Sequence, residues 1–396
     1  MPFADTFRES LSLWGSILMP AVFVILLGSA MGVLYQEAGA TNSIADWLLK
    51  PVEKVKNGDA KVVLAILMFI VFRIILGLAG FVNDAIMITM FAIAAVVFQR
   101  TDIDRRHLNA VLVISGTIGV ILPGAPTMTN VMFELYLPGY DSTAYFFPRL
   151  VLMLLYIAIV CFLMLRYVKK DRMAGRRFEP GNMMIAPPDV NMPPIWLCLI
   201  PVAVVVVAYT FLKTDAWISI AFGLLSTVLC LYRYFPVMEG KTRFASVIHY
   251  GNKGAVLVPL QYLLMVLPAM VVSVSPAFEW GMQAMPNSPI PLYLSFAILS
   301  VVLVSFSGAG ALPIICTAAL SGYIGHGMGM YACVIIATWS CVIFDSLPTN
   351  VSIVIQSELC DCTMKKAYPT IFTTTVVATA CIEVLAIVAA ASGIFG

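Results

Sequence analysis

Long, uninterrupted apolar runs dominate the chain and are separated by short polar segments. The longest runs lie at 11–35, 63–98, 147–168, 194–213, 254–275, 330–357 and 369–394. A helix needs about 20 apolar residues to cross the hydrocarbon core of a bilayer, and each run is about that length or longer. Because the runs are continuous and do not alternate with polar residues, they predict membrane-spanning helices rather than the strands of a β-barrel.

The composition places most of the surface against lipid. Hydrophobic residues make up 61% of the 396 positions and charged residues only 11%, with a formal net charge of +2. An ordinary soluble domain carries about 25% charged residues. We therefore predict an all-α, polytopic membrane protein whose constant partner is the lipid bilayer, and we expect no nucleic-acid partner.

The basic residues predict an orientation. Most of them fall into five clusters, at 50–61, 100–106, 166–177, 233–253 and 365–366. The positive-inside rule places all five in the cytoplasm. The apolar run 63–98 then begins and ends on the cytoplasmic side, and "GLAGFVND" (77–84) interrupts its middle. A re-entrant helical hairpin fits this arrangement, and two full spans joined by a very short outer turn are the alternative.

The same orientation divides the chain into two halves. The first half is predicted at 1–168, with a hairpin at about 63–98 and an interrupted helix at about 108–135. A basic cytoplasmic linker follows at 169–193. The second half is predicted at 194–396, with a hairpin at about 291–322 and an interrupted helix at about 330–357. The second half repeats the first in the opposite orientation, as expected for a transporter built from inverted repeats.

Matching interruptions in the two halves support this repeat. "GLAGFVND" precedes "PGAPTMTN" (123–130) in the first half, and "SFSGAGALP" (305–313) precedes "FDSLPTN" (344–350) in the second. Each interrupted helix contains a Pro-Thr pair followed closely by Asn. A single proline or glycine in a membrane helix is commonly only a kink. Four interruptions, paired across two halves, indicate a binding site.

Broken helices at membrane depth have a chemical consequence. Irregular backbone is tolerated there only where it packs within the protein or lines a wet cavity. The free N–H groups at such breaks and at hairpin tips carry partial positive charge, and glycine lets a ligand approach the backbone closely. Four interruptions that meet near the midplane predict a cradle for a small, polar solute that carries a carboxylate.

Ionisable residues inside the apolar runs are few, and each is a functional candidate. Asp84 closes the first hairpin tip, and Asp345 precedes Pro348 in the second interrupted helix. Either carboxylate is expected to bind a coupling proton or to help bind a cation. Arg73 is expected to reach the cytoplasmic interface by snorkelling, and pairing with Asp84 is the alternative.

Motifs typical of other functions do not occur in the sequence. It contains no Gly-x-Ser-x-Gly, His-Glu-x-x-His or P-loop pattern, and no histidine has a partner at metal-ligand spacing. A membrane enzyme would need a nucleophile, a base and an electrophilic group that converge. We therefore expect no enzymatic activity, no cofactor and no metal site.

Three segments resemble the gluconate permease-type (GntP) family of the ion transporter superfamily, and within it the hydroxybutyrate permease branch. "LPGAPTMTN" (122–130) is similar to that branch's LPGTPxIQN-like segment, and "FSGAGAL" (306–312) is similar to its SASGG-like hairpin tip. The most specific match is "FDSLPTNVSIVIQSELCDCTMKKAYPTIF" (344–372), in which the motif, its spacing and the trailing residues all correspond. The resemblance begins only near residue 14, without the two N-terminal scaffold helices usual in the family.

The resemblance implies proton-linked uptake of sugar acids or small hydroxy acids across a bacterial inner membrane. It also implies a homodimer in which a transport domain moves past a scaffold like an elevator. By position, the substrate-binding residues would be Gly80, Asn83, Pro126, Thr127, Thr129, Asn130, Ser305, Ser307, Gly308, Gly310, Ser346, Pro348, Thr349 and Asn350. Asp84 and Asp345 remain the candidates for ion coupling.

One departure from the family bears on the coupling ion. The family's Pro-His-Asn reads Pro-Thr-Asn here, at 348–350, which removes an imidazole that would bind substrate or carry a proton. Hydroxyl, amide and carbonyl oxygens at broken helices also suit sodium. Proton coupling is the first expectation, a sodium-coupled carboxylate symporter is the alternative, and a passive anion channel is the third possibility.

Overall fold

The structure is a computed structural model that describes residues 12, 22–81, 83–179, 181, 192–253, 255–256, 271–272, 275–307, 311–348 and 351–396. Every regular element within these ranges is helical. Four described helices are long and apolar enough to cross a membrane, and a bent pair, Val22–Glu37 with Ala40–Glu53, is a fifth candidate. These findings confirm the prediction of an all-helical, multi-pass membrane protein.

The first part of the chain forms a hairpin, an interrupted helix and a long helix. In chain order it contains α2 (Ala40–Glu53), α3 (Gly58–Leu78), α4 (Asn83–Thr101), the 3₁₀ turn η1 (Arg105–His107), α5 (Leu108–Ile121), α6 (Met128–Tyr136) and α7 (Phe146–Met173). α3 and α4 pack against each other as the predicted hairpin. Each arm is about 30 Å long, which is compatible with a re-entrant hairpin and also with two spans.

The second part of the chain contains a longer series of helices. It contains α8 (Ile195–Val206), the π-helical η2 (Val207–Phe211), α9 (Ala216–Leu231), the 3₁₀ turn η3 (Tyr232–Tyr234), α11 (Pro276–Ala284), α12 (Leu292–Ser307), α13 (Leu312–Ala318), the π-helical η5 (Ala319–Tyr323), the 3₁₀ turn η6 (Ile324–His326), α14 (Met330–Ile343), α15 (Val351–Leu359), α16 (Met364–Ile371), the π-helical η7 (Phe372–Val377) and α17 (Ala378–Ala391). α12 and α13 form the hairpin, α14 and α15 form the interrupted helix, and α16 to α17 form one long helix.

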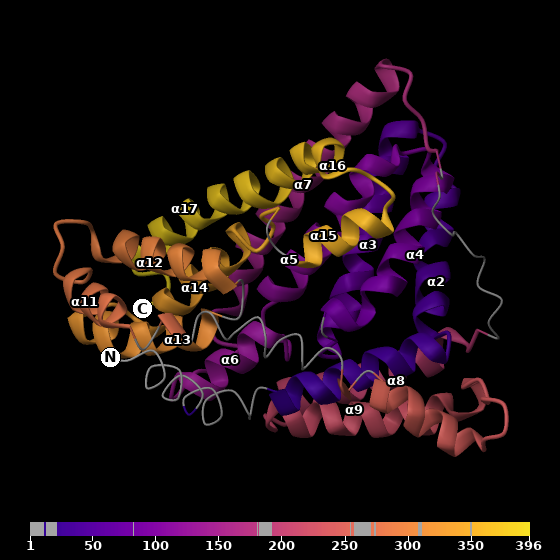
Figure 1. Ribbon diagram of the computed structural model, residues 1–396, viewed down its shortest axis with the longest axis horizontal. Coiled ribbons are helices and arrows are strands. Elements are labelled where there is room, and N and C mark those ends of the chain that lie inside the picture. Colours follow the sequence, from indigo (N-terminus) through magenta and orange to yellow (C-terminus); the bar gives the residue numbers. More distant parts are fainter. Residues whose placement is uncertain are drawn as a thin grey trace.

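The two parts are interlocked. The long helices α7 and α17 pack against each other, and Figure 1 shows them crossing the molecule together. The second hairpin packs against the first interrupted helix, α13 on α6, and the first hairpin packs against the second interrupted helix, α4 on α15. α8 and α9 lie side by side along one edge of the molecule (Figure 1).

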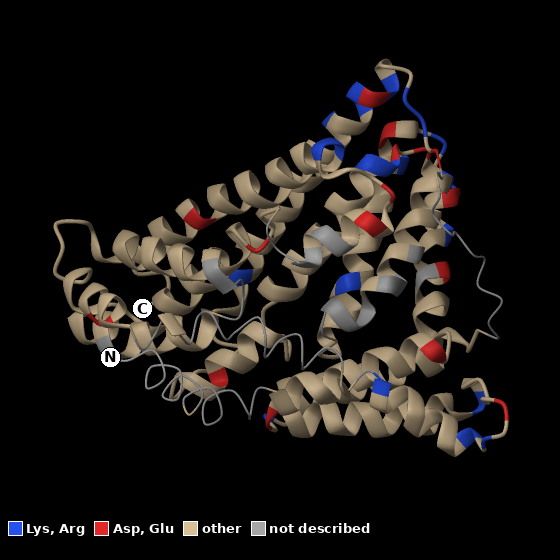
Figure 2. Ribbon diagram, viewed as in Figure 1, with Lys and Arg blue, Asp and Glu red and all other residues tan. Residues whose placement is uncertain are grey.

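Charged side chains are concentrated at helix ends. Figure 2 shows Lys and Arg gathered at the end of α7 and in the loop that follows α9, whereas the middle of the long helices is almost free of them. Both locations belong to the basic clusters that the positive-inside rule assigns to the cytoplasm. α7 continues to Met173, five residues beyond the end expected from its apolar run.

A buried ionic cluster ties together the basic ends of α5, α7 and α16. Asp171 accepts a hydrogen bond from His107 Nε2 at 2.7 Å and pairs with Arg106 and with Arg176. The second ring nitrogen of His107, Nδ1, lies 2.8 Å from the hydroxyl of Thr370. Burial, followed by the neighbouring Arg106 and Arg176 guanidiniums, lowers the pKa of His107 to about 3. The imidazole is therefore neutral and donates its Nε2 proton to Asp171.

Candidate functional site

The tip of the first hairpin is a glycine turn that contacts the first break. Gly80 has φ +75°, and the N–H of Phe81 returns to the carbonyl of Leu76 at 3.2 Å. This is a Schellman helix end, in which the left-handed position favours glycine. A Cβ at Gly80 would lie 3.3 Å from Pro126 and 2.9 Å from Ile220 of α9. The tip therefore touches both the break and a helix of the second half.

The break between α5 and α6 is held by hydrogen bonds at a second glycine. Gly124 has φ +68°, its N–H donates to the carbonyl of Ser142 at 3.1 Å, and its own carbonyl accepts from the hydroxyl of Thr210 at 3.1 Å. Thr127 then caps α6, because its hydroxyl oxygen accepts from the N–H of Asn130 at 3.2 Å. The break is a defined turn rather than a kink.

The side chain of Asn130 fixes the shape of this break. Its amide donates to the carbonyls of Leu122 and Ala125 at 3.1 and 2.8 Å. Its carbonyl oxygen accepts from the Tyr140 hydroxyl and from Arg149 Nη2, both at 2.7 Å. These four bonds use both donors and both lone pairs of the amide. Asn130 thus holds the backbone of the break and places a buried cation, Arg149, beside it.

Thr129 differs from its two polar neighbours. Its side chain is only 1% exposed, and among the described residues its hydroxyl has no hydrogen-bond partner. A buried hydroxyl without a partner costs about 1–3 kcal/mol. Because Thr129 lies in the first turn of α6, where the leading N–H groups of a helix have no intrahelical acceptor, it is a strong candidate to bind a ligand.

Arg73 turns into the protein, and the expectation that it snorkels to the interface is wrong. The side chain is 3% exposed, and it donates from Nε to the carbonyl of Ser115 and from Nη2 to the carbonyl of Phe81, at 3.2 and 3.4 Å. α5 leaves room for it at Gly119, where a Cβ would lie 2.5 Å from the guanidinium carbon. The Arg73 side chain points inward because it finds two carbonyl acceptors there and because Gly119, which has no side chain, leaves space for the guanidinium. The side chain of Asp84 lies outside the described residues.

The second break lies between α14 and α15. Ser346 is buried, and its hydroxyl is 2.7 Å from the hydroxyl of Thr375 in η7. Asp345 is half-buried and Pro348 is exposed. Thr349 and Asn350, which complete the predicted motif, lie outside the described residues.

The remaining predicted positions belong to the two hairpins. Ser305 is exposed on α12, and its hydroxyl donates to the carbonyl of Val302 at 2.6 Å. Asn83 begins α4 and Ser307 ends α12, but the structure does not describe their side chains. Gly308 and Gly310 also lie outside the described residues.

Packing brings the two breaks toward the same part of the bundle. α5, which leads into the first break, packs against α14 and η7, which flank the second. Tyr156 of α7 joins these elements, because its hydroxyl donates to the carbonyl of Thr374 at 3.2 Å and its ring packs edge-on against Trp339 of α14. Of the predicted site residues, Gly80 lies against Pro126, and Thr127, Thr129 and Asn130 follow Pro126 as the cap and first turn of α6.

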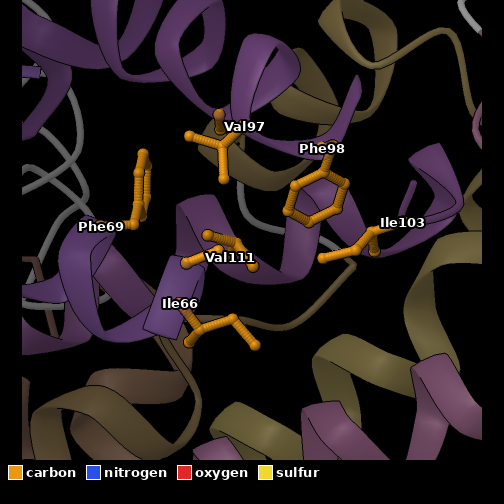
Figure 3. Close-up of a pocket in the computed structure, with 8 residues that line it drawn as sticks. Ile66, Phe69, Val97, Phe98, Ile103 and Val111 are labelled. Atoms are coloured by element: carbon orange, nitrogen blue, oxygen red, sulfur yellow. The ribbon is translucent and has the colours of Figure 1, made fainter. Parts of the chain in front are cut away.

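A crevice between α3, α4 and α5 has different chemistry. It is lined only by apolar side chains, including Ile66, Phe69 and Phe98 (Figure 3). Such a surface offers no hydrogen bond to a charged solute. We regard it as a packing seam of the first hairpin.

Sequence reasoning missed two buried charged residues near these elements. Arg149 at the start of α7 was treated as part of an apolar run, and its contact with Asn130 depends on the fold. Glu383 lies inside the last apolar run and is buried against Ser340 of α14 at 2.8 Å. Like Asp84 and Asp345, Glu383 is an ionisable residue inside an apolar run, and it is therefore a functional candidate.

Comparison with known proteins identifies a fold. No protein-family model matches the chain, and no curated protein matches it. Among solved structures, the YdaH transporter of Alcanivorax borkumensis, described as having an unusual topology, is similar with a TM-score of 0.53. The two share 14% identity, and the match covers 98% of this chain and 88% of that one. The protein therefore shares its overall fold with that transporter, and the resemblance to the GntP family stays a prediction.

Proposed function

We propose that this protein is a secondary active transporter that carries a small organic anion, a hydroxy acid or a sugar acid, together with protons. The observation that carries the proposal is the contact between the Gly80 turn and Pro126, where a hairpin tip meets a broken helix inside a transporter fold. In such folds, broken helices form the substrate site near the midplane.

The chemistry of the first break favours a carboxylate. The N-terminus of α6 presents free N–H groups with partial positive charge, and Thr129 adds a hydroxyl that has no partner among the described residues. Arg149 adds a buried positive charge, which is held beside the break by its hydrogen bond to the carbonyl oxygen of Asn130. A carboxylate bound at α6 would accept from Thr129 and from backbone N–H groups.

The order of elements supports a moving part and a fixed part. A hairpin, an interrupted helix and a long helix occur twice, and these units pack on one another. In this proposal they form the transport domain, and α8 and α9 belong to the scaffold. The contact between Gly80 and Ile220 then lies on the surface along which the domain slides. We further propose a homodimer in a bacterial inner membrane.

Two threonines at the first break, Thr127 and Thr129, test the site. Purified protein is screened by thermal shift against small hydroxy acids and sugar acids. Thr129→Val is expected to raise the stability of the ligand-free protein by up to about 1–3 kcal/mol, because it removes a buried hydroxyl that has no partner among the described residues, and to weaken binding about tenfold, the value of one hydrogen bond. Thr127→Val is the matched variant, and loss of its helix cap should cost about 1 kcal/mol of stability.

The two variants separate binding from folding. Equal affinity in Thr129→Val and the wild type would remove the first break from the binding site. Failure of every acid in the screen to stabilise the wild-type protein would contradict the proposed substrate class.

A further inference from the structure

A buried carboxyl group on the last helix lies outside both breaks. Glu383 of α17 is 4% exposed, and its Oε1 accepts from the hydroxyl of Ser340 on α14 at 2.8 Å. Its other oxygen, Oε2, has no hydrogen-bond partner within the part of the chain that the structure describes. No described Lys, Arg or His forms an ion pair with it.

The groups that face Glu383 are neutral or acidic. α14 contributes Ser340 and the thiol of Cys341, and Cys341 lies within electrostatic range of both Glu383 and Asp345. α7 and α12 also pack against α17, but no charged side chain from their described residues acts on Glu383. Asp345 is the acidic group that shares Cys341 as a neighbour with Glu383.

This environment disfavours an ionised carboxylate. Burying a charge without a cation costs several kcal/mol, and in membrane segments such groups pair, reach water or carry protons. The protonated acid fits the contacts better. Its carbonyl oxygen, Oε1, keeps the bond from Ser340, and Oε2 carries the proton.

A line of buried polar side chains leads from Glu383 to the second break. Thr379 precedes Glu383 by four residues, and its hydroxyl donates to the carbonyl of Thr375, four residues earlier. The hydroxyl of Thr375 lies 2.7 Å from that of Ser346. All of these side chains are buried. Because Glu383, Thr379 and Thr375 are spaced four residues apart, they lie along one face of the helix, between the carboxyl and Ser346, a residue of the predicted substrate site.

We propose that Glu383 is a proton-binding site linked to the second break through Thr379, Thr375 and Ser346. Its role in coupling rests on the proposed function, since the proton would be the one that drives uptake. The presence of the proton on this carboxyl is independent of any substrate.

Infrared difference spectroscopy tests the proton directly. The spectrum of the purified wild type minus that of Glu383→Gln, both at neutral pH, is expected to contain the C=O stretching band of one protonated carboxyl, that of Glu383. Glu279→Gln, at an exposed glutamate of α11, is the matched control and should leave the band unchanged. Ser340→Ala should move the band to higher frequency, because the carbonyl oxygen loses its hydrogen bond. Identical spectra for the wild type and Glu383→Gln would overturn the proposal.

Transport in proteoliposomes tests the coupling. Glu383→Gln is expected to retain exchange of labelled for unlabelled acid. Its accumulation of acid driven by a pH gradient should be at least tenfold lower than that of the wild type. Full proton-driven accumulation in this variant would refute a coupling role. If the wild type moves no organic acid, the proposed function fails, while the infrared result still decides whether Glu383 holds a proton.

Discussion

Replacing Gly119 with alanine is expected to displace the Arg73 guanidinium and to loosen the tip of the first hairpin. The new Cβ would lie 2.5 Å from the guanidinium carbon and 2.7 Å from Nε, and it would overlap Nη2. The side chain of Arg73 would have to leave the carbonyls of Ser115 and Phe81. Phe81 follows Gly80 directly, so the tip would lose its link through Arg73 to Ser115 of α5.

The expected cost follows from these two hydrogen bonds. A hydrogen bond from a charged donor contributes about 1.5–3 kcal/mol, which gives an upper limit of about 6 kcal/mol for both. Alanine recovers up to about 1 kcal/mol through its higher helix propensity. Arg73 is also long enough to find part of its bonding elsewhere. We expect a net loss of about 2–4 kcal/mol, seen as a drop in Tm on the order of 5 °C.

Thermal unfolding in detergent, followed by tryptophan fluorescence, measures this effect. Gly281→Ala is the matched control, because a Cβ at that helical glycine of α11 meets nothing within 4 Å. The control should be as stable as the wild type or slightly more stable. If Gly119→Ala behaves like Gly281→Ala, the guanidinium does not occupy the place described here.

Three further variants probe the buried polar contacts. Asn130→Ala removes the partner of two carbonyls and of Arg149 Nη2, so we expect a loss of about 3 kcal/mol or more in thermal unfolding. Asp171→Asn removes the anion between Arg106 and Arg176 and should cost about 3–5 kcal/mol, seen also as a loss of monodispersity in gel filtration. The pKa of His107 is lowered to about 3 in the folded protein, whereas a histidine in the unfolded chain has a pKa of about 6.5. Below pH 6.5 the unfolded chain therefore carries a proton on His107 that the folded protein does not, and the free energy of unfolding should fall by about 1 kcal/mol per pH unit. His107→Gln should flatten that dependence, and unchanged pH profiles would refute the assignment.

The interrupted helices could be predicted from sequence because their cause is local. Proline and glycine end a helix wherever they stand, so the segment at about 108–135 corresponds closely to α5 and α6. α2 and α11 escaped prediction, because they are shorter and more polar than the membrane runs and gave no comparable signal.

Side-chain partners were harder to predict because they depend on the packing of distant segments. Arg73 was expected to point toward water, and only the fold shows two carbonyl acceptors and the gap at Gly119. Asn130 was expected to face a ligand, whereas its amide bonds are occupied by the break and by Arg149. Thr129 carried no feature in the sequence that separated it from Thr127.

Uptake by reconstituted proteoliposomes tests the proposed function most directly. A labelled hydroxy acid or sugar acid is offered with a pH gradient or a sodium gradient, each imposed alone. The proposal predicts saturable accumulation that requires the pH gradient. Accumulation driven by sodium alone, or a flux that does not saturate and does not accumulate, would contradict it.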